Sequence, residues 1–228
     1  MTRNTKLLGV AAALSFAAVL FFGLYVVRTT VWGTKNPDEL LRGTAAIQLS
    51  LEEQDAPYFA DGIRSLRELE EASLVVVKAR VEGERVMSLR STETGIRIET
   101  IYQDATGSLR EGETVYLVEP FSIVSDEFYS ATNGYQMVRE GEEYLFFLNR
   151  LQAVEGYEFS RKERISFLPS TAKYSRYCLS SDETAAAIIR TGAERLFYRA
   201  YRDYALLSED ENAVSVYQKI REEIRQAY

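Results

Sequence analysis

The stretch Leu74-Val75-Val76-Val77-Lys78-Ala79-Arg80-Val81 decides the fold of this chain. Its apolar, mostly β-branched residues are first continuous and then alternate with charged ones, which is typical of a strand that enters a sheet core. Just before it, Ile63, Leu66 and Leu69 recur at helical spacing within residues 61–72. The sequence therefore predicts a short helix followed by a buried strand.

Further strand patterns follow on the C-terminal side of this stretch. Two charged turns, Glu111-Gly112-Glu113 and Glu140-Gly141-Glu142, each precede an apolar or alternating run. The strands are predicted at residues 95–102, 114–118, 144–148, 157–160, 164–168 and 174–179. The stretch from Ser125 to Gly134 is rich in Ser, Asp, Asn and Gly and is predicted to be a long loop.

Helical spacing returns after the last predicted strand. Ser180-Ser181-Asp182-Glu183 and Ser208-Glu209-Asp210-Glu211 both have the spacing of a capping box, and each precedes apolar residues that share one helix face. Two amphipathic helices joined by a short break predict an antiparallel helical hairpin over residues 181–228.

The N-terminal segment from Leu7 to Val27 is 21 residues long and carries no charge. As a helix it would span about 31 Å, which matches a bilayer core of roughly 30 Å. We expect a retained membrane anchor rather than a cleaved signal peptide, whose apolar region usually has only about 7–15 residues. The basic, acid-free tail before it favours a cytoplasmic N-terminus and an extracytoplasmic domain, and the opposite topology stays open. Residues 1–35 thus form the tail, anchor and juxtamembrane segment, and residues 36–60 form a linker or arm.

Charge and residue counts exclude several functions. Residues 1–35 contain four bases and no acid, so residues 36–228 carry 34 acids against 23 bases. A domain with this net charge of −11 repels nucleic acid, which is therefore not an expected partner. The chain has no His, which excludes Ser–His and Cys–His nucleophile pairs and His-containing zinc sites, and Cys178 has no second Cys to pair with. We expect no cofactor, no bound metal and no catalytic residue.

Three stretches resemble a known kind of domain. Residues 65–77, 109–115 and 140–148 (SLRELEEASLVVV, LREGETV and EGEEYLFFL) resemble small exported bacterial domains with an OB-like barrel, which is similar to the inhibitory domain of the tissue inhibitors of metalloproteinases. The resemblance covers about residues 61–168 and implies a fold and an extracytoplasmic location. It does not imply protease inhibition, because those inhibitors place an N-terminal Cys on the protease zinc and this chain has none there.

The prediction is therefore an α+β protein with an N-terminal transmembrane helix, an OB-like β-barrel over residues 61–180 and a C-terminal helical hairpin. Its leading function is a membrane-anchored extracytoplasmic binding module without catalytic activity, located in the cell membrane through the N-terminal helix. Its expected partner is a protein or an envelope component. The alternatives are an envelope hydrolase that uses carboxylates or a Ser–Lys pair, and a cytoplasm-facing, membrane-tethered regulator.

The candidate binding surface combines Tyr and Arg side chains, which favour interfaces, with the predicted loop. It consists of Tyr129, Asn133, Tyr135, Arg195, Arg199 and Arg202. The hydrolase alternative depends on Ser170-Thr171-Ala172-Lys173, which has the Ser-x-x-Lys spacing of penicillin-recognising enzymes. The local sequence after Pro169 favours a strand or loop rather than the helix that this chemistry needs.

Overall fold

The computed structural model describes residues 37, 41, 47–52, 58–88, 90–124, 127–153, 155–180, 186–188 and 196–228. The predicted membrane segment, residues 7–27, lies outside these residues. Within the described part of the chain, no helix is long and apolar enough to cross a membrane. Residues Lys35–Tyr228 form one compact unit, and the following description concerns this unit.

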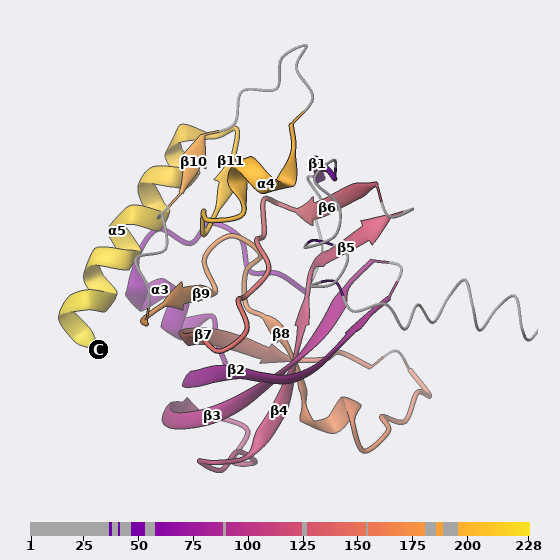
Figure 1. The fold of residues 1–228 in the computed structure, drawn as a ribbon. Helices are drawn as coiled ribbons and strands as arrows, with labels where there is room; N and C mark the ends of the chain where they lie inside the picture. The colour runs from indigo at the N-terminus through magenta and orange to yellow at the C-terminus, as the bar shows by residue number, and fades with distance from the viewer. Residues whose placement is uncertain are drawn as a thin grey trace, which may run out of the picture. The chain divides into compact units, whose positions relative to one another are not determined.

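A closed five-stranded barrel is the centre of the unit (Figure 1). Its strands are β2 (Val75–Met87), β3 (Thr92–Asp104), β4 (Thr114–Glu119), β7 (Glu143–Arg150) and β8 (Ser166–Pro169). They pair in the order β2-β3-β4-β8-β7, and β2 also pairs with β7, which closes the barrel. β4 and β8 are parallel and the other pairs are antiparallel. The predicted α+β class with a β-barrel is confirmed, and the strand order is compatible with an OB-like barrel.

The continuous apolar run that opens β2 is explained by burial on both faces. Val75 and Val77 face the barrel interior, whereas Val76 belongs to a second cluster outside the barrel. In β7, Phe146 likewise points inward and Phe147 outward. Each of these large apolar side chains contributes about 1.5–3 kcal/mol of hydrophobic stabilisation when fully buried.

Two helices cover the outward-facing cluster. They are α3 (Leu66–Glu71) and α5 (Glu211–Ala227). The side chain of Ser65 caps α3 by accepting a hydrogen bond from the backbone N–H of Glu68, and Glu223 on α5 accepts one from the N–H of Leu66 at 2.7 Å. The helix predicted within residues 61–72 is thus confirmed.

A second, three-stranded sheet lies beside the barrel. It consists of β1 (Gln48–Glu52), β6 (Phe128–Thr132) and β5 (Phe121–Val124), in that order. The prediction of a loop from Ser125 to Gly134 is therefore wrong for the residues of β6. Their side chains alternate as in a strand, although the surrounding Ser, Asp, Asn and Gly residues are typical of a loop. The ring of Tyr129 stacks on that of Phe121 with a centroid separation of 5.2 Å, and both rings belong to the buried cluster that packs against this sheet.

The predicted helical hairpin is half correct. α5 forms and is capped by Asp210, whose side chain accepts from the N–H of Asn212 at 2.8 Å. Before it lie the two-residue strands β10 (Ala187–Ile188) and β11 (Leu207–Ser208), which pair in parallel, and the four-residue helix α4 (Tyr198–Tyr201). Residues 181–185 and 189–195 of the first predicted helix lie outside the described residues. Its described C-terminal part is not one continuous helix, and Leu206 and Leu207 pack into two different clusters, as alternating strand residues do.

The shorter predicted strands have mixed outcomes. The strands predicted at 164–168 and 174–179 correspond to β8 and to β9 (Arg176–Cys178), which pairs with β7. The strand predicted at 157–160 is wrong, and η1 (Glu163–Ile165) follows this region as a 3-10 helix. Tyr157 is exposed there, so its large side chain does not join a buried sheet face.

Candidate functional site

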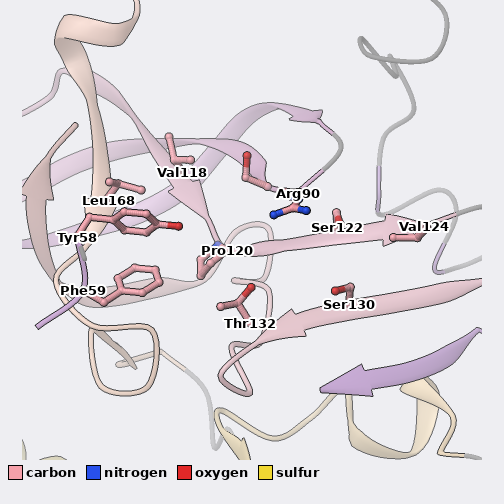
Figure 2. Close-up of a pocket in the computed structure, with 11 residues that line it drawn as sticks. Tyr58, Phe59, Arg90, Val118, Pro120, Ser122, Val124, Ser130, Thr132 and Leu168 are labelled. Atoms are coloured by element: carbon pink, nitrogen blue, oxygen red, sulfur yellow. The ribbon is translucent and has the colours of Figure 1, made fainter. Parts of the chain in front are cut away.

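A cavity of about 450 Å³ lies between the end of the barrel and the β5–β6 hairpin (Figure 2). Its volume falls within the roughly 300–1,000 Å³ that is usual for small-molecule sites. The cavity is lined by Tyr58, Phe59, Arg90, Ser91, Val118, Pro120, Ser122, Val124, Ser130, Thr132 and Leu168.

The floor of the cavity is a row of hydroxyl groups. Ser122 on β5 pairs directly with Ser130 on β6, and Thr132 lies two residues further along the same face. The intervening residues, such as Tyr129 and Ala131, point to the opposite face and are fully buried in the core. The alternation of side chains along the two strands therefore places all three hydroxyls on the cavity side.

Two of these hydroxyls have no hydrogen-bond partner among the described residues. Ser122 is 4% exposed and Thr132 is 9% exposed, and both line the cavity. Neither hydroxyl is among the buried polar atoms without a partner, which in the described residues belong to Gln136 and Tyr177, so both are accessible from the cavity. A ligand that displaces solvent from these hydroxyls must replace its hydrogen bonds.

Aromatic and aliphatic side chains form the wall. The rings of Tyr58 and Phe59 meet edge to face at 4.7 Å, and the adjacent N–H of Ala60 donates to the carbonyl of Ser170 at 2.8 Å, which ties this segment to the barrel. Phe59 is buried, whereas Tyr58 is 39% exposed. The wall thus combines apolar ring faces with one accessible phenol.

Arg90 carries the charge of the site. It is exposed in the turn between β2 and β3, and it is the one charged side chain among the described residues that line the cavity. No carboxylate of the described residues forms an ion pair with it. Figure 2 shows its guanidinium on the β5 side of the cavity and the rings of Tyr58 and Phe59 on the other side.

A buried carboxylate fixes the strand end beside the cavity. Glu119, the last residue of β4, accepts hydrogen bonds from Thr94 Oγ1 at 2.5 Å, from the Tyr135 hydroxyl at 3.1 Å and from the N–H of Val138 at 2.9 Å. Burial raises the pKa of Glu119, although the charges of Arg85 and Arg176 and the hydrogen bonds from Thr94 and Val138 oppose the shift. The next residue is Pro120, so the network holds the cavity lining in place.

Two of the predicted binding residues are interior residues. Tyr129 is 0% and Tyr135 2% exposed, and their hydroxyls respectively accept from the N–H of Met137 and donate to Glu119. Their burial corrects the prediction that these rings form an exposed binding surface. Asn133 adopts a positive φ of 50° in the turn after β6 and lines a separate cavity of about 60 Å³.

Two of the three predicted arginines are described, and neither is at the main cavity. Arg199 is exposed on α4, and Arg202 is exposed with its Nε 3.8 Å from Asp203, whereas Arg195 is outside the described residues. Neither Arg199 nor Arg202 lines the cavity.

The Ser-x-x-Lys motif is not assembled as a catalytic pair. Ser170 is fully buried, and its Oγ lies 2.8 Å from the Oγ of Ser73. Lys173 instead lines the smaller cavity together with Glu209. Within the described residues, no hydrogen bond joins Ser170 to Lys173, and no group of three or more Asp, Glu or Cys residues has the geometry of a metal site.

Comparisons with known proteins do not assign the site. No protein-family model matches the chain. No curated protein matches it either.

The residues of the cavity were not among the predicted site residues. One signal was present in the sequence: Phe121-Ser122-Ile123 and Tyr129-Ser130-Ala131-Thr132 both alternate apolar and hydroxyl residues. Two such strands, paired as neighbours in one sheet with their hydroxyl residues in register, predict a hydroxyl-bearing surface. The contribution of Arg90 had no comparable signal, because it depends on where the β2–β3 turn lies in three dimensions.

Proposed function

We propose that this protein is a membrane-anchored, extracytoplasmic binding module without catalytic activity, and that the cavity beside the β5–β6 hairpin is its ligand site. The observation that carries the proposal is the pair of hydroxyls of Ser122 and Thr132, which line the cavity and hydrogen-bond to no described residue. A concave site with apolar walls and a few convergent polar groups is the usual form of a small-molecule site.

The barrel and the apolar N-terminal segment support the same proposal. OB-like barrels bind ligands with an exposed strand face and its loops, and here the cavity lies at the end of β4, next to β8. The uncharged segment from Leu7 to Val27 has the length of a membrane anchor, and the basic tail before it favours an external domain.

The topology is tested with a single-cysteine variant of the full chain. Cys178→Ala removes the native thiol, and Glu158→Cys introduces one at an exposed position. We expect a membrane-impermeant maleimide to label Glu158→Cys on intact, wall-stripped cells, while a cytoplasmic thiol protein stays unlabelled. Labelling that requires membrane permeabilisation would place the domain inside and refute the location.

The site is tested with a photoreactive phenylalanine derivative. Placed at Tyr58, it should form light-dependent adducts in intact cells, because this ring is at the cavity wall and partly exposed. The matched control is the same derivative at Tyr157, which is also exposed but does not line the cavity. Equal adduct patterns at the two positions, or no adduct at Tyr58, would contradict the assignment of the cavity as the ligand site.

A further inference from the structure

We infer that the cavity binds an acidic saccharide, with the acid group on Arg90, the sugar hydroxyls on Ser122 and Thr132, and a ring face against Tyr58. This inference rests on the proposed function, because it names the ligand class of the same site.

The hydroxyl floor favours a ligand rich in hydroxyl groups. Each Ser or Thr hydroxyl both donates and accepts hydrogen bonds, and so does each hydroxyl of a sugar. Ser122 and Thr132 line the cavity and hydrogen-bond to no described residue, so a polyol can hydrogen-bond to both at once. A purely apolar ligand would leave these two groups unpaired, at a cost in affinity for each.

The wall favours a ligand that also has apolar faces. Tyr58 and Phe59 present aromatic carbon, and Val118, Pro120 and Leu168 add aliphatic carbon at the barrel end. A sugar ring combines C–H groups on its faces with hydroxyls around its rim. Its faces therefore suit this wall while its rim reaches the hydroxyl floor.

The charge at Arg90 favours an acid group on that sugar. Residues 36–228 carry 34 acids against 23 bases, and Arg90 is the charged side chain that lines the cavity among the described residues. On the outer face of the barrel, for comparison, Lys78 lies within 3.2 Å of both Glu99 and Glu143. Arg90 has no such partner among the described residues and offers a planar fork of donors that matches a carboxylate or phosphate.

The same charge balance limits how acidic the ligand is. A domain with a net charge of −11 repels a long polyanion, even though salt screens this repulsion beyond about 10 Å. A saccharide with isolated acid groups meets Arg90 without bringing a continuous run of negative charge to the acidic surface.

Three disaccharides that differ at one position test the inference. Cellobiose is neutral, cellobiouronic acid carries a carboxylate in place of one hydroxymethyl group, and cellobiose 6′-phosphate carries a phosphate there. Each is titrated by calorimetry into the full chain in lipid nanodiscs. We expect either acidic disaccharide to bind roughly 10- to 100-fold more tightly than cellobiose, as a charge-assisted hydrogen bond predicts. Whichever binds more tightly identifies the acid group as carboxylate or phosphate.

Variants separate the roles of the charge and the hydroxyls. Arg90→Gln should abolish the difference between acidic and neutral disaccharides, whereas Arg161→Gln, the same change at an exposed position outside the cavity, should preserve it. Thr132→Val keeps the shape and removes the hydroxyl, and it should weaken all three disaccharides by a similar factor of roughly 2 to 10. Arg90 is exposed, so its replacement is not expected to disturb folding.

Several results would overturn the inference. Equal affinities for cellobiose and both acidic forms would refute the role of the acid group, and an equal effect of Arg161→Gln would refute the role of Arg90. If no disaccharide binds while the photoreactive group at Tyr58 still forms specific adducts in cells, the saccharide class is wrong and the proposed function stands. If the Tyr58 adducts are also absent, the proposed ligand site itself fails.

Discussion

Replacement of the buried carboxylate by Glu119→Leu should be among the most damaging single changes in this domain. Leucine has a similar volume but accepts no hydrogen bond. The hydroxyls of Thr94 and Tyr135 and the N–H of Val138 would all lose their acceptor in a site that excludes water. The buried guanidinium of Arg85 would at the same time lose its counter-charge.

The expected loss of stability follows from these contacts. Removing one of two buried opposite charges that attract each other costs up to about 3–5 kcal/mol, because the remaining charge is left uncompensated. For a domain of this size, 1 kcal/mol corresponds to a change in Tm of about 2–4 °C, so Glu119→Leu should lower Tm by roughly 6–20 °C. Glu113→Gln, at an exposed position, is the control and should change the unfolding free energy by less than about 0.5 kcal/mol.

A double-mutant cycle tests the physical reason for the loss. With Arg85→Met added, the orphaned charge is gone, so the double variant should be less destabilised than the sum of the two single variants, by about 0.5–3 kcal/mol. Urea unfolding followed by circular dichroism measures all four proteins. Additive effects, or a Glu119→Leu variant as stable as the Glu113→Gln control, would refute the claim that Glu119 and Arg85 form a coupled buried network.

Three further predictions concern pH, a turn and the Ser-x-x-Lys motif. Burial raises the pKa of Glu119 in the folded state above its ordinary value of 4.5. The contribution of this group to stability is therefore present below pH 4.5 and is lost as pH rises through the raised pKa. Glu119→Gln should remove this contribution, as a comparison of the unfolding free energies of the two proteins across this pH range will show. Gly134 has a φ of 76°, and Gly134→Ala would place a Cβ 1.6 Å from the carbonyl oxygen of Leu207, so the backbone would have to move. We expect the unfolding free energy in urea to fall by at least about 2 kcal/mol, and an unchanged midpoint would contradict this. Ser170→Ala should lower the unfolding free energy by only about 1 kcal/mol, through loss of the contact with Ser73, and should leave ligand binding unchanged; a loss of binding in a folded variant would revive a functional role for this serine.

The elements that the sequence predicted correctly are those with one clear period. The strand that begins near Val75 was recognisable from its apolar continuity, and α5 from its spacing after residues 208–211. Both are long enough for the pattern to outweigh local composition.

The errors arose where composition or tertiary packing competed with the pattern. Residues 128–132 were assigned to a loop because Ser, Asn and Asp dominate the neighbourhood, although Tyr129 and Ala131 alternate inward as in a strand. Leu207 was placed on the apolar face of a predicted helix, but it packs in one cluster while the adjacent Leu206 packs in another. The cavity was beyond prediction for a related reason, since its wall, floor and charge come from segments that only barrel closure brings together.

The site and the stability of the barrel are linked through Glu119, where β4 ends, and Pro120, which follows it. Pro120 has no backbone N–H and fixed φ, so the β4 ladder cannot continue past Glu119, and the chain leaves the barrel there to form the β5–β6 hairpin. The hydroxyl floor at Ser122 begins two residues later. The anchoring of Glu119 therefore determines where the hairpin starts, and with it the distance between the hydroxyl floor and the aromatic wall at Tyr58. On this argument the buried carboxylate acts on the cavity as a positioning group, and we expect a change that releases it to shift the hydroxyl floor relative to the aromatic wall.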